Sequence, residues 1–515
     1  MVLKLITTRE MRILETNSVG LGVSTRMLME AAGKSVADLI ASRVKPSRDL
    51  RVVVLVGKGG NGGDGLVAAR YLTSYGYRVE VIPSHSLREL EHPDAKYNVS
   101  IVARLPSITI HNPGDPEPIN GASIIVDALL GTGVKGVLRD PIKRLVEASN
   151  GVNAVLKVAI DTPTGLDPDT GEVHGVAFKA DVTVTMHDLK PGLLKRPELV
   201  GEIVVANIGI PIEAKLYVGP GDVIYGRPIK PPTAHKGMGG KVMVVGGSKY
   251  YTGAPALVGE AALASGADLA FVVVPEVIKP VVSGYSEELI VLGVPGNSFS
   301  EESIKLVSKY YELFKPHVIV FGNGLSREPE PMEFAEKFIE WAVAVKAPLV
   351  IDADALRAIK YGVTKLSWRA VITPHRGEFK ALTGVELTEN PYVDYRYVTN
   401  ASKVLESTVL LKAPIDIIAQ GDDYRFNKTG NPGMTVGGTG DVLAGIVGAV
   451  YAYTGDPYMS ASIAAYLNGL AGDYLLRVLG ENPLPTKIVN VLPRVINEVL
   501  EVHLRTYGIT LNSNG

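Results

Sequence analysis

The chain has 515 residues, of which 46% are hydrophobic and 21% charged, and its formal net charge at pH 7 is −2. This length predicts two or three domains, and the small net charge gives no basic field for nucleic-acid binding. No apolar run approaches the ~20 residues of a membrane helix, and the absence of cysteine excludes disulfides, thiol catalysis and cysteine-bound metals. The N-terminal segment is too polar for a secretory signal, so we expect a cytoplasmic protein without a membrane or nucleic-acid partner.

The first half alternates short β-branched segments with longer helical ones, a pattern typical of α/β folds with parallel sheets. RVVVLV (51–56) is predicted to be a buried strand, followed by a glycine loop, a helix and the strand YRVEVI (77–82). Further strands are expected in SIIVDALL, AVLKVAID, DVTVTM and GEIVVA.

The first glycine loop, GKGGNG (57–62), matches the GxGxxG pattern between a strand and a helix, and Glu80 lies near the place of a ribose-binding acid. This pattern favours a Rossmann dehydrogenase. The loop continues with Asn61 and Asp64, however, where a pyrophosphate requires only backbone amides. A carboxylate there repels a diphosphate unless a cation or another task occupies it, so we do not favour dinucleotide oxidoreduction.

Three more polar residues follow neighbouring strands: Asp127 ends SIIVD, Asp161 ends KVAID, and Thr164 comes shortly after. Parallel strands would bring them to one edge of the sheet together with Asn61. Oxygen ligands of this kind suit a hard cation. Each acid taken singly is also typical of a helix cap or turn, but the set favours a site.

These motifs resemble a known domain. LMEAAG (28–33), GGNGGDGLVAARYL, VDALLGTGVKG and AIDTPTGLDPDTG are similar to the Rossmann-like NAD(P)HX epimerase domain of the NAD(P)H-hydrate repair enzymes, over nearly all of residues 1–215. The resemblance implies interconversion of the R and S hydrates of NADH and NADPH. The family usually has Asn at the position of Gly60.

The resemblance also implies the site residues. The hydrated nucleotide would contact Gly60, Asn61, Gly62, Gly63, Asp64, Gly131, Thr132, Gly133, Val134, Lys135, Gly136, Val137 and Asp161. Potassium would bind to Asn61, Asp127 and Thr164. Epimerising a hemiaminal carbon requires the hydroxyl to leave and return, or the ring to open, beside a carboxylate that faces the developing cation. Asp161 is the predicted catalytic residue.

A second series of strands begins at KVMVVGGS (from Lys241) and continues through LAFVVV, VIVFGNG, PLVIDADAL, AVITPH, TVLLK and DIIAQ. The proline- and glycine-rich segment 225–240 is the predicted boundary. We therefore predict two three-layer α/β/α domains, residues 1–225 and 226–515, each with a ligand site at the carboxyl ends of its strands.

The second glycine loop, GGTGDVLAG (437–445), precedes a helix. The amides of Gly438, Thr439 and Gly440 and the helix dipole would bind a phosphoryl group, and Asp441 would accept a hydroxyl proton. Asp441 could also simply complement the dipole, but a cap needs no such loop. The loop is neither a Walker A nor a protein-kinase motif.

This loop, with HKGMGGKVMVVGGSKYYTGAPALVGEAALASGADL, GNGL, VIDADAL and ITPHRGEF, resembles the NAD(P)HX dehydratase domain of the ribokinase-like superfamily over residues 230–505. The resemblance implies Asp441 as catalytic base, and contacts of the hydrate with Ala254, Gly324 and His375. The nucleotide would contact Lys412, Ala413, Pro414, Ile415, Asp416, Gly438, Thr439 and Gly440. Ala413 and Asp416 depart from the family's KGxxT-like pattern.

The implied cofactors are ADP as phosphoryl donor and Mg²⁺. DAD (352–354) is equally typical of a magnesium ligand set and of a chain turn. The hydroxyl of the S hydrate would be phosphorylated and the phosphate ester would then leave, giving NAD(P)H. We expect a homo-oligomer. Two alternatives stay open: a vitamin or sugar kinase fused to a nucleotide-binding module, and a first domain that only binds.

Overall fold

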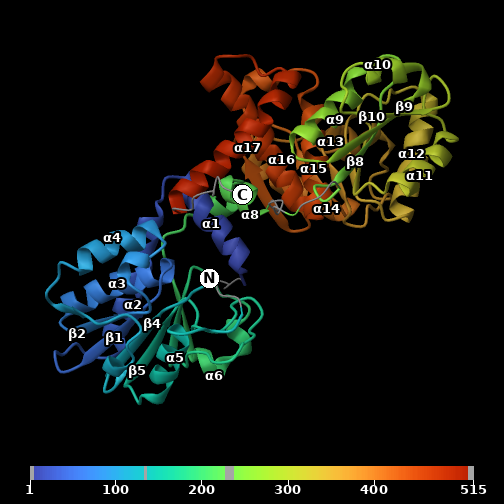
Figure 1. The fold of residues 1–515 in the computed structure, drawn as a ribbon. Coiled ribbons are helices and arrows are strands. Elements are labelled where there is room, and N and C mark those ends of the chain that lie inside the picture. The colour runs from blue at the N-terminus through green and yellow to red at the C-terminus, as the bar shows by residue number, and fades with distance from the viewer. Residues whose placement is uncertain (1–4, 133–135, 227–232, 234–236, 508–515) are drawn as a thin grey trace. The chain divides into compact units, whose positions relative to one another are not determined.

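The computed structural model describes residues 5–132, 136–226, 233 and 237–507 (Figure 1). The chain divides into two compact units, built on Met1–Ala214 and on Lys215–Leu500. Residues 215–224, which precede the predicted boundary segment, pack in the second unit. There Asp222 pairs with Arg425, and the Val218 amide donates to the Phe426 carbonyl at 2.9 Å.

The first unit contains a parallel seven-stranded sheet in the order β3-β2-β1-β4-β5-β6-β7. Its strands are β1 (Arg51–Val56), β2 (Arg78–Pro83), β3 (Ile108–Ile110), β4 (Ile124–Ala128), β5 (Leu156–Ile160), β6 (Val182–Met186) and β7 (Glu202–Ala206). The strand order reverses between β1 and β4, and ligands of such sheets bind at this switch point.

Helices cover both faces of this sheet. Val52, Val54 and Val56 of β1 pack in a core with α1 (Thr8–Gly20), α2 (Thr25–Arg43) and α3 (Gly60–Tyr75). Val53 and Leu55 point to the opposite core, which contains α5 (Ile142–Gly151). A strand buried on both faces must be apolar throughout, which is why β1 is continuously β-branched or leucine after Arg51.

The second unit has a nine-stranded sheet in the order β10-β9-β8-β11-β12-β13-β14-β15-β16, in which β14–β15 and β15–β16 are antiparallel pairs. The strands are β8 (Lys241–Val245), β9 (Leu269–Pro275), β10 (Ile290–Val294), β11 (Val318–Phe321), β12 (Leu349–Ile351), β13 (Ala370–Ile372), β14 (Thr408–Leu411), β15 (Asp416–Gln420) and β16 (Asp423–Asn427). TVLLK and DIIAQ, both expected as strands, thus form the antiparallel pair β14–β15.

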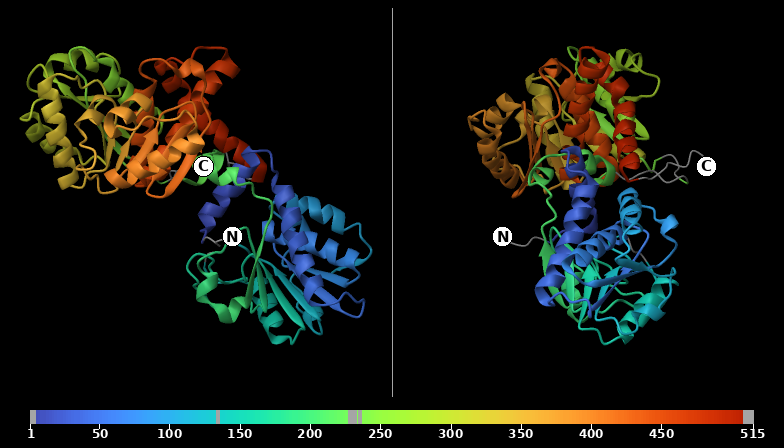
Figure 2. Two further views of the ribbon diagram at one scale, coloured as in Figure 1. Left: turned by 180° about the vertical axis from the view of Figure 1, so that it is seen from behind. Right: turned by 90° about the vertical axis from the view of Figure 1, so that its left-hand side faces the viewer.

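This sheet also lies between two helical layers, which can be followed by colour from two directions in Figure 2. One core joins it to α9 (Gly253–Ala264), α15 (Thr439–Thr454), α16 (Pro457–Tyr474) and α17 (Pro485–Tyr507). The other joins it to α11 (Ser303–Phe314), α12 (Pro329–Ala344), α13 (Arg376–Thr383) and α14 (Pro391–Leu405). The prediction of two three-layer α/β/α units is confirmed. Among the described residues, no helix combines the length and apolarity that crossing a membrane requires.

Candidate active sites

The first glycine loop joins β1 to α3 and lies directly against the chain that follows β4. A Cβ on Gly57 would stand 1.6 Å from the Leu129 carbonyl oxygen, and one on Gly62 would stand 2.1 Å from the carbonyl oxygen of Gly57. Only glycine allows these approaches. Gly60 differs, because a Cβ there would meet only the His92 ring at 3.8 Å. The loop geometry therefore does not require glycine at this position.

Asp127 and Thr164 contact each other at the carboxyl edge of the first sheet. The Thr164 hydroxyl donates to Asp127 Oδ1 and the Thr164 amide to Oδ2, each at 2.8 Å, and the Leu129 amide donates to Oδ1 at 3.2 Å. Asp127 is fully buried and its hydrogen-bond donors here are neutral. Burial raises its pKa to about 6, although the bonds from Thr164 and Leu129 oppose this shift.

Asn61 lies beside this pair. The Leu130 amide donates to the Thr164 hydroxyl at 3.0 Å, and a Cβ on the next residue, Gly131, would be 3.4 Å from Asn61 Cβ. Both amide atoms of the Asn61 side chain are buried and have no hydrogen-bond partner among the described residues. Buried polar atoms normally have a partner, so an unpartnered amide oxygen beside a buried carboxylate fits a cation site. Thr132 and Gly136 belong to the same loop, whereas Gly133, Val134 and Lys135 lie outside the described residues.

Asp161 follows β5 in a left-handed backbone conformation, with φ at 63°. Its Oδ1 accepts a hydrogen bond from the Lys190 ammonium at 2.7 Å and from the Met186 amide at 3.2 Å. Lys190 is fully buried. Its ammonium also donates to the Thr185 hydroxyl at 3.0 Å and to the Met186 carbonyl at 2.8 Å. Three protein oxygens thus use all three of its N–H donors.

Two further carboxyl groups act electrostatically on this pair. Burial raises the pKa of Glu15 to about 7, the charge of Asp161 adds to the rise, and Lys190 opposes it. Burial also raises the pKa of Asp64 well above its usual range, and Asp161 and Glu15 contribute. The site therefore contains an ion pair and two carboxyl groups that carry a proton more readily than an exposed acid.

Glu80, the acid that a GxGxxG pattern would assign to a ribose, faces the other end of the sheet. It is 2% exposed and lies 2.9 Å from His111 Nε2, 3.1 Å from Arg78 and 3.6 Å from Arg51. Arg78 and Arg51 are the first residues of β2 and β1, at the amino edge of the sheet. Three protein partners thus occupy the Glu80 carboxylate, which does not favour a ribose contact.

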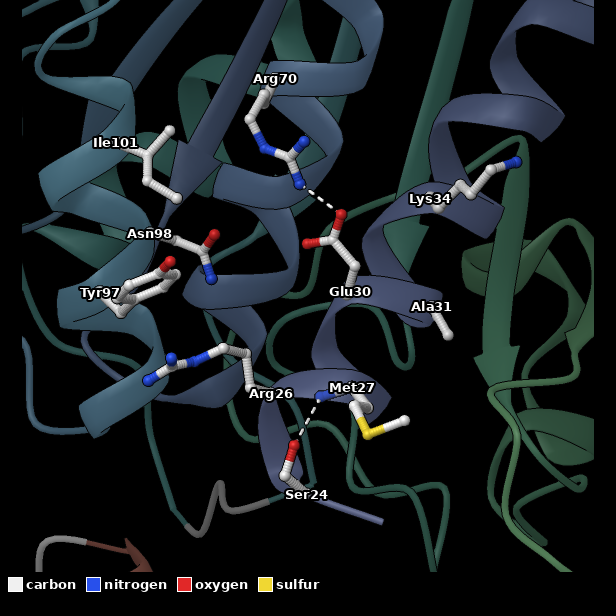
Figure 3. A pocket seen from close by; sticks show the side chains of 10 residues that line it. All are labelled: Ser24, Arg26, Met27, Glu30, Ala31, Lys34, Arg70, Tyr97, Asn98 and Ile101. Carbon is white, nitrogen blue, oxygen red and sulfur yellow. Dashed lines mark hydrogen bonds and ion pairs between the residues drawn. The ribbon is translucent and has the colours of Figure 1, made fainter.

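A groove of about 670 Å³ lies outside these residues, between α2, α3 and α4 (Pro93–Val102) (Figure 3). Its cationic side chains already have acidic partners: Arg70 pairs with Glu30 at 2.5 Å, Lys34 with Asp38, and Arg26 with Asp94. None of the predicted site residues lines it.

In the second unit, the predicted phosphoryl loop leads into α15. Gly438 is the N-cap with φ at 98°, and Asp441 lies in the first turn. Asp441 Oδ1 accepts a hydrogen bond from the Asn323 side-chain amide at 2.7 Å. Burial and the charge of Asp352 raise the pKa of Asp441 to about 7, while Asn323 and Lys412 lower it. A carboxyl group with this pKa is suited to accept a proton near neutral pH.

The DAD sequence, which is equally typical of a metal site and of a turn, has both carboxylates bound by protein donors. Asp352 accepts from Lys412 Nζ at 2.8 Å, Thr373 Oγ1 at 2.7 Å and Asn323 Nδ2 at 3.0 Å. Asp354 accepts from Arg327 Nε at 2.8 Å and from the Ser326 amide at 3.1 Å. The described residues contain no cluster of three or more acidic or histidine side chains that would hold a metal.

KAPID (412–416), the segment predicted to contact the nucleotide, begins beside the phosphoryl loop. A Cβ on Gly440 would be 3.4 Å from Lys412 Nζ, which places the ammonium next to the amides of α15. Asp416 instead accepts from the Ala413 amide at 3.0 Å and from Asn427 Nδ2 at 2.9 Å. Burial raises its pKa to about 6. Its carboxyl group therefore closes the turn that contains Pro414 and Ile415.

The predicted hydrate contacts come from the first turn of α9, the loop after β11 and the N-cap of α13. A Cβ on Gly324 would lie 3.1 Å from Ala254 Cβ, so these two positions adjoin. His375 forms a backbone bridge with Lys412 and caps α13, because its Nδ1 accepts the Glu378 amide hydrogen at 3.1 Å. The His375 side chain is 59% exposed, and its other ring nitrogen, Nε2, is 3.4 Å from Glu378 Oε1.

Comparison with known proteins decides what these two sites belong to. Residues 25–192 match the family model described as YjeF-related protein N-terminus, and residues 242–494 match that of NAD(P)H-hydrate dehydratase. Three relatives are named bifunctional NAD(P)H-hydrate repair enzyme. The protein of Hyperthermus butylicus is 39% identical over 97% of this chain and 93% of its own. Those of Pyrobaculum aerophilum and Archaeoglobus fulgidus are 41% and 42% identical, over 95% and 96% of this chain and 98% and 99% of theirs.

The chain belongs to the bifunctional NAD(P)H-hydrate repair enzymes.

In this repair enzyme, sequence reasoning did not single out three side chains that contact or face the predicted catalytic acids: Lys190, Glu15 and Asn323. Lys190 lies in LKPG and Asn323 in GNGL, and both follow strand ends, which was the available signal. Glu15 lies within α1, far before the first glycine loop in the sequence, and only the fold brings it near Asp161.

Proposed function

We propose that this repair enzyme interconverts the R and S hydrates of NADH and NADPH in its first unit, and dehydrates the S hydrate in its second. The second reaction consumes ADP and gives NAD(P)H, AMP and phosphate. The observation that carries the proposal is a pair of separate carboxylate sites, one at the carboxyl edge of each sheet. Asp161 is paired with buried Lys190, and Asp441 lies at the start of α15 beside its glycine loop.

The first reaction requires a hydroxyl to leave a carbon that is bonded to a ring nitrogen. The hydroxyl takes a proton and leaves as water with the C–O electron pair, and the nitrogen lone pair stabilises the remaining cation. Asp161 supplies a fixed negative charge opposite that cation. Glu15 and Asp64, with raised pKa values, supply and recover the proton. Return of water to the opposite face completes the inversion.

Asn61, Asp127 and Thr164 would hold potassium. Asp127 is a buried carboxylate with neutral hydrogen-bond donors, and Asn61 has an unpartnered amide oxygen, so a cation would compensate both. When bound, the ion supplies positive charge that fixes the loops after β4 and β5, which carry Gly131 and Asp161.

In the second reaction, the hydroxyl oxygen of the substrate bonds to the terminal phosphorus of ADP, and Asp441 accepts the hydroxyl proton. The P–O bond to AMP breaks, and AMP leaves with the electron pair. The amides of Gly438 and Gly440 and the Lys412 ammonium stabilise the charge on the phosphoryl oxygens. The phosphate ester is then a good leaving group: it departs as phosphate with the C–O electron pair and leaves a cation stabilised by the ring nitrogen. Loss of a proton from the adjacent ring carbon to the departing phosphate or to water restores the ring double bond. Magnesium, when bound with the nucleotide, neutralises phosphate charge.

The experiment is a complete conversion assay. We expect a mixture of R and S NADHX, with K⁺, Mg²⁺ and either ADP or ATP, to regain the full NADH absorbance with the preferred donor. Asp161→Asn is the control for spontaneous epimerisation, and it should convert the S fraction rapidly and the R fraction only at the uncatalysed rate. No conversion with either donor would refute dehydration. Equal R conversion by the variant would refute the catalytic role of Asp161, and R conversion no faster than without enzyme would refute enzymatic epimerisation. We further propose that the enzyme is cytoplasmic and homo-oligomeric, and size-exclusion chromatography with light scattering tests the latter.

A further inference from the structure

Asn323 lies at the crossing of three loops that follow parallel strands of the second unit. It is fully buried, two residues after β11. Its carbonyl accepts the Gly247 amide hydrogen at 2.9 Å from the loop after β8, and a Cβ on Gly246 would stand 2.4 Å from that same oxygen. These contacts fix the backbone of Asn323, and thereby the position from which its side chain reaches Asp441.

Two carboxylates use both protons of the Asn323 amide group. Nδ2 donates to Asp441 Oδ1 at 2.7 Å and to Asp352 Oδ2 at 3.0 Å. Oδ1 of Asn323 is buried and has no partner among the described residues. Turning the amide over would place this oxygen against two carboxylate oxygens. Both N–H groups of this amide thus bind acids while its oxygen has no partner. The two acids therefore set the orientation of the amide.

We propose that Asn323 is the positioning residue of the dehydratase site: it holds Oδ1 of Asp441 so that Oδ2 is presented to the substrate hydroxyl, and it couples Asp441 to the buried Asp352–Lys412 pair. This inference rests on the proposed dehydration and names a residue that acts through the catalytic base rather than on the substrate.

The link through Asn323 affects the protonation state of Asp441 as well as the orientation of its carboxyl group. The negative charges of Asp352 and, to a smaller extent, Asp354 act on Asp441, and Lys412 opposes them and pairs with Asp352 at 2.8 Å. Asn323 separates the two carboxylates with a neutral donor that serves both. A residue without that donor would leave two neighbouring carboxylates facing each other, which favours the protonated and inactive form of the base.

The test is the pH dependence of kcat for dehydration of S-NADHX in Asn323→Leu and Asn323→Asp. Leucine has a similar size and lacks both donors, and aspartate keeps the shape but cannot donate to both acids. We expect kcat at neutral pH to fall roughly 10- to 100-fold, as for loss of a hydrogen bond to a charged group, with KM for the hydrate and for ADP nearly unchanged. The acid limb of the kcat profile should move to higher pH, and further for aspartate.

Ser402→Ala is the matched control, because Ser402 is also fully buried and makes two hydrogen bonds, to the Ser407 carbonyl and the Gly421 amide. It should lose stability and keep the wild-type pH profile. ADP affinity, measured by calorimetry, reports whether each Asn323 variant is folded. An unchanged acid limb, or a loss confined to KM, overturns the inference in an enzyme whose wild type is active. An inactive wild type would instead refute the proposed function.

Discussion

Replacing Lys190 by methionine removes the only ammonium that contacts Asp161 among the described residues, and methionine keeps most of the aliphatic volume. The Lys190 ammonium donates to three oxygens at 2.7, 3.0 and 2.8 Å. After the change, Asp161 Oδ1 keeps the Met186 amide at 3.2 Å and the Thr185 hydroxyl at 3.5 Å. The carboxylate thus remains in place with weak neutral donors only.

The magnitude follows from the burial of the pair. Lys190 is 0% exposed and the Asp161 side chain is 14% exposed. Removing one partner of a buried pair costs about 3–5 kcal/mol, and the residual access of Asp161 to water places the expected loss near the lower end. For a unit of this size, ~3 kcal/mol lowers Tm by roughly 6–12 °C. Epimerisation should fall at least ~100-fold, because the fixed charge opposite the cation is displaced.

The assay follows conversion of R to S NADHX by chromatography, together with thermal unfolding. Lys34→Met is the matched control, since it removes an ion pair of α2 in which both side chains are about half exposed, Lys34 with Asp38. Such surface pairs contribute little, so we expect no measurable change. If Lys190→Met retained both wild-type Tm and wild-type epimerisation, the role assigned to the buried ion pair would be wrong.

Four more outcomes follow from the two sites. Asp441→Asn should lower dehydration at least ~100-fold and leave R-to-S conversion intact; loss of both would refute separate sites. Because burial and Asp352 raise the pKa of Asp441 to about 7 and the base acts when ionised, kcat for dehydration should fall about tenfold per pH unit below pH ~7 and level off above it; a profile flat to pH ~5 would contradict this role. Thr164→Val removes a donor to Asp127 and a proposed cation ligand, and should raise the K⁺ concentration for half-maximal epimerisation about tenfold or more; an unchanged K⁺ titration would exclude Thr164 as a ligand. Gly57→Ala places a Cβ 1.6 Å from Leu129 O and should destabilise the first unit by more than ~2 kcal/mol in thermal unfolding, whereas Gly59→Ala meets nothing within 4 Å and should leave Tm unchanged.

Much of the fold could be predicted because its signals are local. Strands buried on both faces, such as β1, need continuous β-branched residues, and glycine pairs mark the turns from strand to helix. Asp127 and Thr164 were also placed together correctly, because parallel strands bring their carboxyl ends to one edge. Strand order predicts that they share this edge, and the structure adds that they contact each other at 2.8 Å.

What could not be predicted depends on side-chain geometry. Glu80 had the expected spacing, but Arg51, Arg78 and His111 already pair with its carboxylate. Asp352 looked available for a metal, yet three protein donors use its two oxygens. A sequence gives the position of a carboxylate along a strand, whereas its partners come from residues tens to hundreds of positions away. Glu15 shows the same limit, since no local pattern links α1 to the end of β5.

The uneven crowding of the first glycine loop has a consequence for how this enzyme family can diverge. Gly57 and Gly62 have no room for a side chain, so neither position can drift without breaking the contact between the loops after β1 and β4. Gly59 has open space and Gly60 only an ordinary contact with His92. New side chains can therefore be gained at these two neighbouring positions while the scaffold stays intact. Under the proposed function, these are the positions where selection or an engineer can change the surface of the loop without disturbing the fold.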